Sequence, residues 1–248
     1  PLVKSLASII TIGTGGSAGR EGPIAQIGAG FGSFLANKAG LSERERRLLV
    51  LAGAAGGIGA IFRAPLGGAL FVSEVLYGST ALEFGAVIPA FIASITAYTV
   101  LAAIYGQGLA FTTSGELAFN NISELAFYLI FAVVCSLVGY VYVQVFYGLR
   151  NHFFRRLPIP NFLKPAVGGL MLGAFALWLP QLMSGGYGWI QQAMDGKLTL
   201  AMLAILCFGK ILATSFTISS GGSGGVFAPS LFIGAMLGGA YGMACDQI

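Results

Sequence analysis

The chain has 248 residues, of which 56% are hydrophobic and 9% are charged, and its formal net charge is +4 at pH 7. A soluble domain carries about 25% charged residues and needs polar surface to cover itself. This composition excludes an ordinary soluble domain. It predicts an all-α, multi-pass integral membrane protein, since several apolar stretches are long enough to cross a bilayer.

The first segment, residues 4–33, joins two apolar helices through a glycine-rich break that ends at Pro23. Broken backbone at membrane depth is tolerated only inside protein or beside a water-filled cavity. Proline suits the first turn of a helix, because its missing N–H would have no intrahelical partner there. The segment therefore predicts a helix that begins within the membrane.

Two ionisable residues, Arg20 and Glu21, lie in this break. Charged side chains at membrane depth are costly and by default mark a transport pathway. Because Glu21 falls at the positive end of the predicted helix, its carboxylate can occupy an anion site and block it, and protonation would release it. We expect a proton-linked gate; the alternative is a structural pair between Arg20 and Glu21 at a surface turn.

Glycines recur at four-residue spacing farther along, as at Gly28 and Gly32 and again at Gly53 and Gly57. Small residues at this spacing let membrane helices approach closely. We therefore expect these glycines to pack helix against helix.

Cations gather in two loops, which we call the first and second basic clusters. The first contains Lys38, Arg44, Arg46 and Arg47, and the second contains Arg150, Arg155, Arg156 and Lys164. The positive-inside rule predicts that both face the cytoplasm. A nucleic-acid surface is the rival interpretation, but predicted membrane segments flank both loops, so we expect no nucleic-acid partner.

Three later stretches are apolar over the length that a spanning helix needs. They are residues Phe84–Tyr105, Leu125–Tyr147 and Leu198–Thr217.

The first segment recurs without a gap at residues 210–239. Matches of glycine and alanine arise readily by chance in such a sequence, but several identities are of other types: Lys4 with Lys210, Thr11 with Thr217, Ser17 with Ser223, and Pro23 with Pro229. Transporters are often built from such repeats, with the substrate site where the repeats meet. Two helix N-termini aimed at one place would bind an anion without a lysine. The sequence leaves open whether the repeats are parallel or inverted.

The repeated lysines, Lys4 and Lys210, lie near the two breaks. We expect them to add positive field to the pathway; the alternative is that they extend toward the membrane surface.

Both breaks also fit the G-x-S-x-G pattern of hydrolases, which requires a preceding strand and a histidine base. Helical sequence precedes both, and the sole histidine, His152, lies in the second basic cluster. We therefore expect no enzyme and no cofactor. No metal site is expected, since no cluster has ligand spacing and the cysteines lie in apolar segments, at Cys135, Cys207 and Cys245.

Residues 19–23, Gly-Arg-Glu-Gly-Pro, resemble the GREGP signature of the CLC chloride channels and proton-coupled chloride exchangers. Residues 225–229, Gly-Val-Phe-Ala-Pro, resemble that family's G-x-F-x-P signature. Lys4 precedes Gly19 by fifteen positions, as the family's lysine does, and residues 62–74 are similar to its stretch after the third core helix. The resemblance spans essentially residues 1–248.

This resemblance implies one transmembrane domain over residues 1–248, the central part of a CLC pore domain whose N- and C-terminal parts lie outside this chain. It implies inverted repeats of tilted, broken helices whose N-termini meet at a central anion site. It also implies a homodimer with one chloride path per subunit, and we expect the inner membrane of a prokaryote. The family's G-S-G-I-P motif and pore tyrosine would lie before Pro1 and after Ile248.

Carried over residue by residue, Glu21 would be the gating glutamate. The backbone around Arg20, Glu21 and Gly22 would line an outer anion site. The backbone at Val226 and Phe227, with Ala228 beside them, would line the central one.

Exchangers of this family usually carry two adjacent glutamates after the position of Phe71, the second acting as inner proton relay. Here the pair reads Glu74-Val75, so the relay carboxylate is absent at Val75. We interpret Glu74 as structural rather than as a substitute relay. We therefore expect glutamate-gated, channel-like transport of chloride or another small anion. The alternatives are a Cl⁻/H⁺ antiporter, with protons as a second substrate, and a non-conducting scaffold, against which the two breaks argue.

Overall fold

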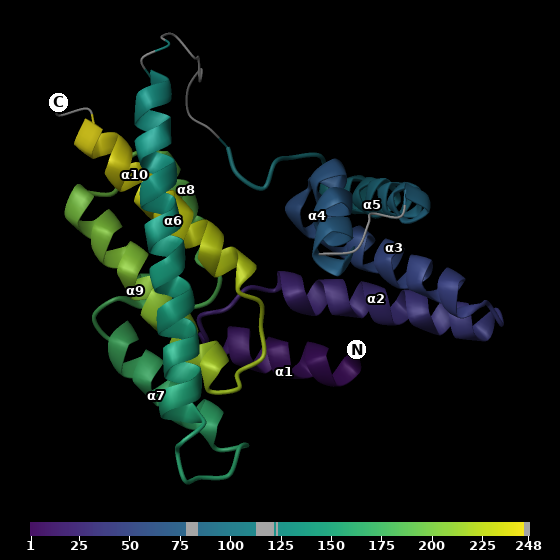
Figure 1. The fold of residues 1–248 in the computed structure, drawn as a ribbon, viewed down its shortest axis with the longest axis horizontal. Helices are drawn as coiled ribbons and strands as arrows, with labels where there is room; N and C mark the ends of the chain where they lie inside the picture. The colour runs from purple at the N-terminus through teal and green to yellow at the C-terminus, as the bar shows by residue number, and fades with distance from the viewer. Residues whose placement is uncertain (78–83, 113–121, 123, 246–248) are drawn as a thin grey trace. The chain divides into compact units, whose positions relative to one another are not determined.

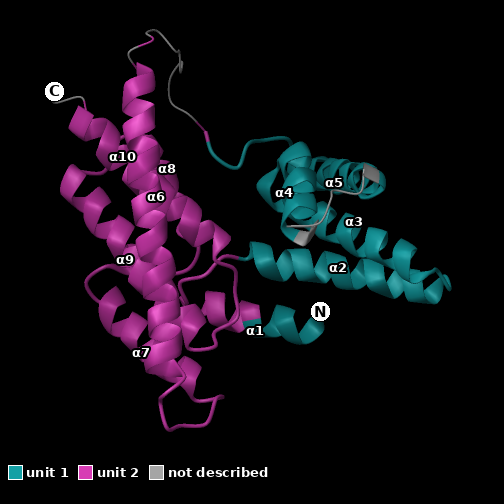
Figure 2. Cartoon of the chain, viewed as in Figure 1, with its two compact units in different colours: residues 1–7, 20–111 teal, residues 8–19, 112–248 magenta. Residues whose placement is uncertain are grey.

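The computed structural model describes residues 1–77, 84–112, 122 and 124–245 (Figure 1). Over these residues the secondary structure is helical, apart from one isolated antiparallel bridge between Gly19 and Gly225. The prediction of an all-α protein is confirmed. The chain forms two compact units (Figure 2): unit 1 is residues 1–7 with 20–111, and unit 2 is residues 8–19 with 112–248.

The first helix, α1 (Leu2–Gly13), begins in unit 1 and ends in unit 2. The other helices of unit 1 are α2 (Glu21–Lys38), α3 (Glu43–Phe62), α4 (Pro65–Tyr77) and α5 (Phe84–Tyr105). Unit 2 contains α6 (Glu124–Gly148), the π-helix η1 (Leu149–Phe154), α7 (Lys164–Ala176), the 3-10 turn η2 (Pro180–Leu182), α8 (Tyr187–Met194), α9 (Leu200–Ser219) and α10 (Phe227–Cys245).

In unit 1, α2 and α3 form a helical hairpin packed through glycine (Figure 1). A Cβ added at Gly28 would meet the carbonyl of Gly53, and one added at Gly53 would meet that of Gly28. One added at Gly57 would lie 2.9 Å from the carbonyl oxygen of Ile24. The expectation of glycine-mediated helix packing is confirmed.

The start of α3 is fixed by a capping box. The Ser42 hydroxyl accepts the N–H of Glu45, and the Glu45 carboxylate accepts the N–H of Ser42 at 2.8 Å. Such reciprocal bonds satisfy donors that the first helical turn would otherwise leave unpaired. The apolar core of the unit then forms where α3 meets α4 and α5, around Leu51, Ile58 and Val72.

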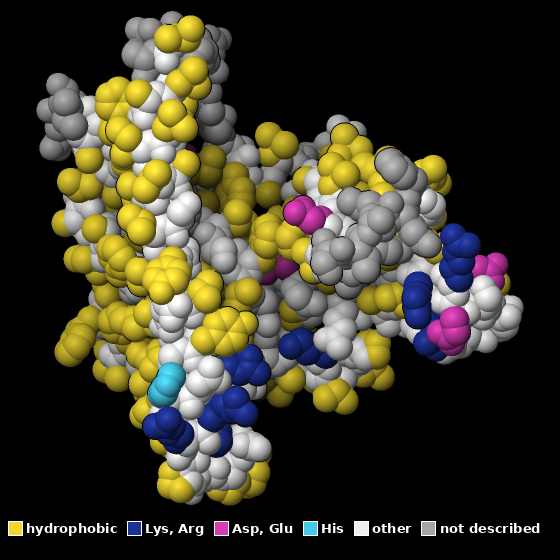
Figure 3. Space-filling view, viewed as in Figure 1, with side chains coloured by type: hydrophobic (Ala, Val, Ile, Leu, Met, Phe, Trp, Pro, Cys, Tyr) yellow, Lys and Arg dark blue, Asp and Glu magenta, His cyan; other side chains and the backbone are white. Residues whose placement is uncertain are grey.

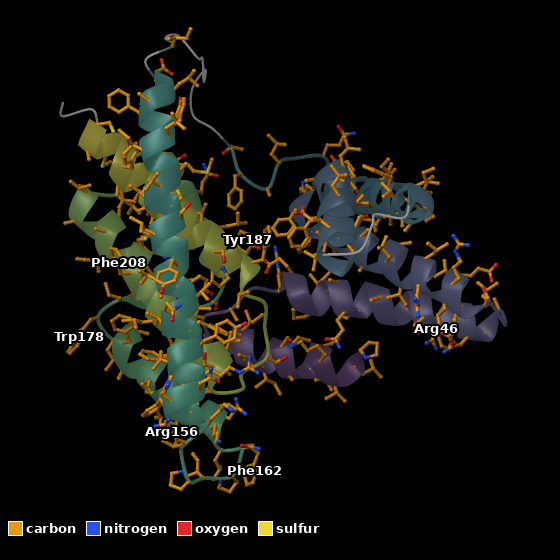
Figure 4. The ribbon with its side chains drawn as sticks, in the orientation of Figure 1. Arg46, Arg156, Phe162, Trp178, Tyr187 and Phe208 are labelled. Atoms are coloured by element: carbon orange, nitrogen blue, oxygen red, sulfur yellow. The ribbon has the colours of Figure 1, made fainter. Side chains whose placement is uncertain are left out.

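In unit 2, α9 is the central helix. It packs against α6, α7 and α10, and Leu203, Leu206 and Ile211 on it are fully or almost fully buried. The outer residues of the unit are apolar: Phe208 on α9 and Trp178 after α7 are exposed and labelled in Figure 4. Because large apolar side chains face outward, this surface suits a lipid environment.

Four described helices are long and apolar enough to cross a membrane. They are Gly85–Tyr105, Glu124–Phe154, Leu200–Ser219 and Phe227–Cys245. Three of them coincide with the predicted spans, and the fourth is the second helix of the later repeat. The protein is an integral membrane protein, with unburied apolar faces as Figure 3 shows.

Candidate functional site

Each repeat contains the same turn after its first helix. We call residues 13–19 the first glycine turn and residues 219–225 the second. Gly15 has φ +98° and Gly221 has φ +108°, a left-handed backbone that favours glycine. The next residue then folds back: the N–H of Gly16 donates to the carbonyl of Thr11 at 2.8 Å, as the N–H of Gly222 does to its repeat equivalent at 3.0 Å.

This second bond explains the second glycine of each pair. A Cβ at Gly16 would collide with the carbonyl of Thr11, and one at Gly222 would collide with that of Thr217. The two consecutive glycines are thus required for different reasons, the first for its left-handed conformation and the second for its close backbone approach.

The two turns bond to each other reciprocally. The N–H of Ser17 donates to the hydroxyl of Thr217 at 3.0 Å, and the N–H of Ser223 donates to the hydroxyl of Thr11 at 3.1 Å. These residues exchange roles under the 206-residue register that aligns the repeats.

Two further contacts repeat the exchange. The hydroxyls of Ser17 and Thr214 are 3.1 Å apart, and those of Ser223 and Ser8 are 2.9 Å apart. At the centre, Gly19 and the aligned glycine of the second turn each donate an N–H to the other's carbonyl at 2.7 Å. Contacts that are reciprocal in this way imply a local two-fold axis. The antiparallel bridge between these two glycines lies on that axis.

A helix begins directly after each half of the bridge. Glu21, the first residue of α2, is two residues after Gly19, and Phe227, the first residue of α10, is two residues after Gly225. The first turn of a helix has N–H groups without intrahelical acceptors and carries a partial positive charge. Each of the two positive helix ends is therefore two residues along the chain from the same bridge.

At the first helix start, Glu21 is buried, with 2% of its surface exposed, and Pro23 behind it is buried too. Arg20 is exposed and occupies the N-cap position without capping through its side chain. Gly22 is exposed. A surface turn carrying Arg20 and Glu21 together, the alternative from sequence, does not describe this buried carboxylate.

At the second helix start, exposure falls along the chain. Val226 is 42% exposed, Phe227 is half-buried and Ala228 is fully buried. Under the repeat register Phe227 occupies the position of Glu21. The ionisable group is therefore present at only one of the two helix starts.

The proposed relay position lies on α4. Glu74 and Val75 are both exposed in this chain, next to the buried Ser73, whose hydroxyl bonds the carbonyl of Ala69 at 2.8 Å. The described side chains of α4 thus place no second carboxylate beside Glu74.

Lys210 is fully buried on α9, and its ammonium donates to the carbonyls of Leu182 at 2.9 Å and Ser184 at 2.7 Å. It also lies 4.8 Å from the centre of the Phe232 ring. A lysine held in this way does not extend toward the membrane surface. Its repeat equivalent, Lys4, is only half-buried.

Ser184 continues this chain of contacts to the first glycine turn. Its N–H donates to the carbonyl of Gly15 at 3.1 Å and its hydroxyl to the carbonyl of Ile12 at 3.0 Å. Its φ of 51° is unusual for serine. Lys210 and Ser184 therefore form a link, which we call the Lys210–Ser184 strap, that holds the C-terminal end of α1.

Sequence reasoning did not assign these hydroxyls or Ser184. The repeat alignment carries a signal for the hydroxyls, because Thr11, Ser17 and Ser8 all align with hydroxyl residues. It carries none for Ser184, which lies outside both repeats.

The family model described as "Voltage gated chloride channel" matches residues 1–248. The chain is 33% identical over 250 residues to the H(+)/Cl(-) exchange transporter ClcA of Cronobacter sakazakii, covering 98% of this chain and 53% of that protein. It is 32% identical over 246 residues to the putative chloride channel protein ClcB-like of Ralstonia nicotianae, covering 97% of this chain and 56% of that protein. The chain thus spans about half the length of these curated relatives.

A solved structure, described as the X-ray crystal structure of a slow cyanobacterial Cl⁻/H⁺ antiporter, is similar in fold. The TM-score is 0.89 at 23% identity, over 99% of this chain and 58% of that chain. At this identity the likeness concerns the fold, and it confirms the predicted CLC-type arrangement of inverted repeats and broken helices.

Proposed function

Because the chain belongs to the voltage gated chloride channel family, we propose that the complete protein exchanges chloride, or a similar small anion, for protons. The observation that carries the proposal is the buried carboxylate of Glu21 in the first turn of α2, two residues after Gly19 of the bridge. A positive helix end attracts an anion and a carboxylate alike. Glu21 and the transported anion therefore compete for one place.

Competition of this kind links the anion to the proton. With the carboxylate ionised, Glu21 occupies the site and excludes the anion. Once protonated it has no charge to offer the helix end, so the anion replaces it and the side chain carries the proton away. We assign Glu21 as the gate, Arg20 and Gly22 as its neighbours at the outer anion site, and Val226, Phe227 and Ala228 as the start of the central one.

We thus propose an exchanger, whereas the sequence alone favoured channel-like transport. The channel interpretation rested on Val75, which stands where exchangers usually have a second glutamate. Against it, a relative covering 98% of this chain is named an H(+)/Cl(-) exchange transporter. Exchange then needs a relay other than Val75, and we assign Glu74, exposed beside it, to this role in place of the structural one that the sequence favoured.

A channel remains the second candidate, supported by Val75. A chain that lacks the relay carboxylate would let anions pass without moving protons. In either case we propose a homodimer with one anion path per subunit, in the inner membrane of a prokaryote.

The test is proton movement driven by a chloride gradient, measured with the full-length protein in liposomes. Exchange predicts uphill proton movement that stops when the chloride gradient is removed. Chloride flux without linked proton movement would establish the channel instead. If exchange is seen, Glu74→Gln should slow proton movement far more than chloride movement; equal slowing of both would remove Glu74 from the relay.

A further inference from the structure

Three of the four residues of the second basic cluster line a cavity of about 340 Å³ in unit 2. Arg150, Arg155 and Lys164 line it, together with Asn161 and the backbone of Gly221. This volume is within the range of small-molecule sites. The Lys and Arg side chains gather at this end of unit 2 in Figure 3, and Arg156 and Phe162 mark it in Figure 4.

The π-helix η1 brings the two arginines together. The N–H of Arg155 donates to the carbonyl of Arg150 at 3.0 Å, a bond between residues five apart. In an α-helix such residues point about 140° apart, whereas the wider π-turn brings them closer to the same face. Arg150 and Arg155 therefore both line the cavity, and the Arg155 guanidinium also donates to Oδ1 of Asn151 at 3.4 Å.

The third cation adds to a site that is already positive. Lys164 is the first residue of α7, whose first turn contains no acidic residue and whose N-cap, Leu163, makes no side-chain bond. A positive helix end normally favours an anionic neighbour. The first turn of α7 instead has Lys164, so the positive helix end and the positive lysine side chain lie together at the wall of the cavity.

Nothing in this region of the chain balances these cations. The sequence has no Asp or Glu between Glu124 and Asp195, and no described carboxylate pairs with Arg150, Arg155 or Lys164. The first basic cluster differs, since acidic residues alternate with its cations and Arg46 pairs with Glu43 at 2.9 Å. The second cluster alone presents a concave, uncompensated positive site.

The position of the cavity indicates the source of its anion. It lies at the end of the apolar span Glu124–Phe154, most of whose side chains are not buried. Basic pockets at the cytoplasmic end of membrane helices suit anionic lipid headgroups, and the exposed Phe162 nearby suits the same interface.

We propose that this cavity binds the phosphate-bearing headgroup of an anionic phospholipid. Arg150 and Arg155 grip the phosphate oxygens as forked donors, and Lys164 supplies a third charge. The acyl chains lie along the apolar surface of α6.

The cavity also touches the second glycine turn. The hydroxyl of Ser219 donates to the carbonyl of Phe146 on α6 at 3.0 Å, and that of Ser220 donates to the carbonyl of Thr217 at 2.9 Å. Both serines and Gly221 line the cavity. A bound headgroup therefore stabilises the turn that precedes α10, and we expect it to increase anion flux. This effect on flux rests on the proposed function; the binding itself does not.

The test measures binding of fluorescent phosphatidylglycerol to the full-length protein in zwitterionic detergent. The variant combines Arg150→Gln, Arg155→Gln and Lys164→Gln. The matched control combines Lys38→Gln, Arg46→Gln and Arg47→Gln, which removes the same charge from the first basic cluster. Each basic side chain near an anionic lipid contributes a factor of about five. We therefore expect about a hundredfold weaker binding for the variant and less than fivefold for the control.

Equal losses in variant and control would overturn the proposal, because binding would then follow net charge alone. Displacement of the lipid by millimolar inorganic phosphate would also overturn it, in favour of a free phosphate site. Should the triple variant fold poorly, Arg150→Lys with Arg155→Lys keeps the charge, and loss of the forked donors should still weaken binding about tenfold. Flux of the wild type should rise when phosphatidylglycerol is added to phosphatidylcholine vesicles, and flux of the triple variant should not.

Discussion

The two glycine turns have the same internal geometry but different surroundings. Both combine a left-handed glycine with a second glycine that folds back on a threonine carbonyl, and each donates to the other's hydroxyls. The first, however, leads to Glu21 and is held from outside by the Lys210–Ser184 strap. The second leads to Phe227 and borders the basic cavity.

The backbone geometry of the site is thus shared by the two repeats, whereas its ionisable group and its outer contacts are not. Symmetric contacts fix where two helices begin, and they do so through residues that the repeats share. The ionisable gate is a residue in which the repeats differ. The external supports involve Ser184, which lies outside the repeats, and Lys210, whose repeat equivalent Lys4 is only half-buried. Substitutions at equivalent positions of the two glycine turns should therefore have similar effects on the free energy of unfolding. Substitutions at the gate or at the external supports should have different effects from those at their repeat equivalents.

The largest expected effect is at Glu21. Glu21→Gln keeps the shape of the side chain but holds it permanently neutral, so the site should stay open and proton coupling should be lost. We expect chloride-driven proton movement to fall to the background of empty liposomes, and chloride flux to lose its dependence on pH. Glu43→Gln, which changes an exposed glutamate in the first turn of α3, is the control and should leave both unchanged. Retained coupling in Glu21→Gln would refute the gate.

The next largest effect concerns the strap. Lys210→Met removes the donor to the buried carbonyls of Leu182 and Ser184, and an unsatisfied buried acceptor costs about 1–3 kcal/mol. We expect a loss of about 3 kcal/mol in the free energy of unfolding, seen as a lower melting temperature in detergent. Lys4→Met, at the half-buried repeat equivalent, should cost less than about 1 kcal/mol. Equal losses would show that the strap adds nothing beyond the repeat.

A smaller and nearly symmetric effect is expected at the left-handed glycines. Gly15→Ala and Gly221→Ala should each cost about 1–2 kcal/mol, because a Cβ disfavours this backbone conformation. The Gly15 variant should be the worse of the two, since its Cβ would lie 3.2 Å from Sδ of Met183, against 3.5 Å from Cγ of Pro165 at Gly221. Gly13→Ala, where a Cβ meets nothing within 4 Å, is the control and should not destabilise the protein.

The smallest effect is expected at the paired serines. Ser17→Ala and Ser223→Ala each remove one hydroxyl contact between the repeats, worth about 1 kcal/mol. Ser17 lies in the more buried pair, so its loss should be slightly larger. A difference of more than about 1 kcal/mol in melting measurements would contradict the local two-fold axis.

Sequence alone determined much of this protein. Its composition indicated a membrane environment, and its apolar runs located three of the four candidate spans, although one of these extends to Phe154, seven residues beyond the predicted end at Tyr147. The 206-residue repeat located both breaks, because glycine, proline and hydroxyl residues are needed at fixed places in a turn whatever surrounds it. The residues at the starts of α2 and α10 followed directly.

Only the tertiary structure decided how the repeats meet and what supports them. The repeat in the sequence does not show how its two copies contact each other. The local two-fold axis became evident only from the reciprocal bonds between Ser17 and Thr217 and between Ser223 and Thr11. Ser184 gave no signal in the sequence, and the second basic cluster was visible only as a group of cations, not as the lining of a cavity. Their roles depend on segments far apart in the chain, and no local pattern of residue types encodes which distant backbone carbonyl or helix end a side chain will reach.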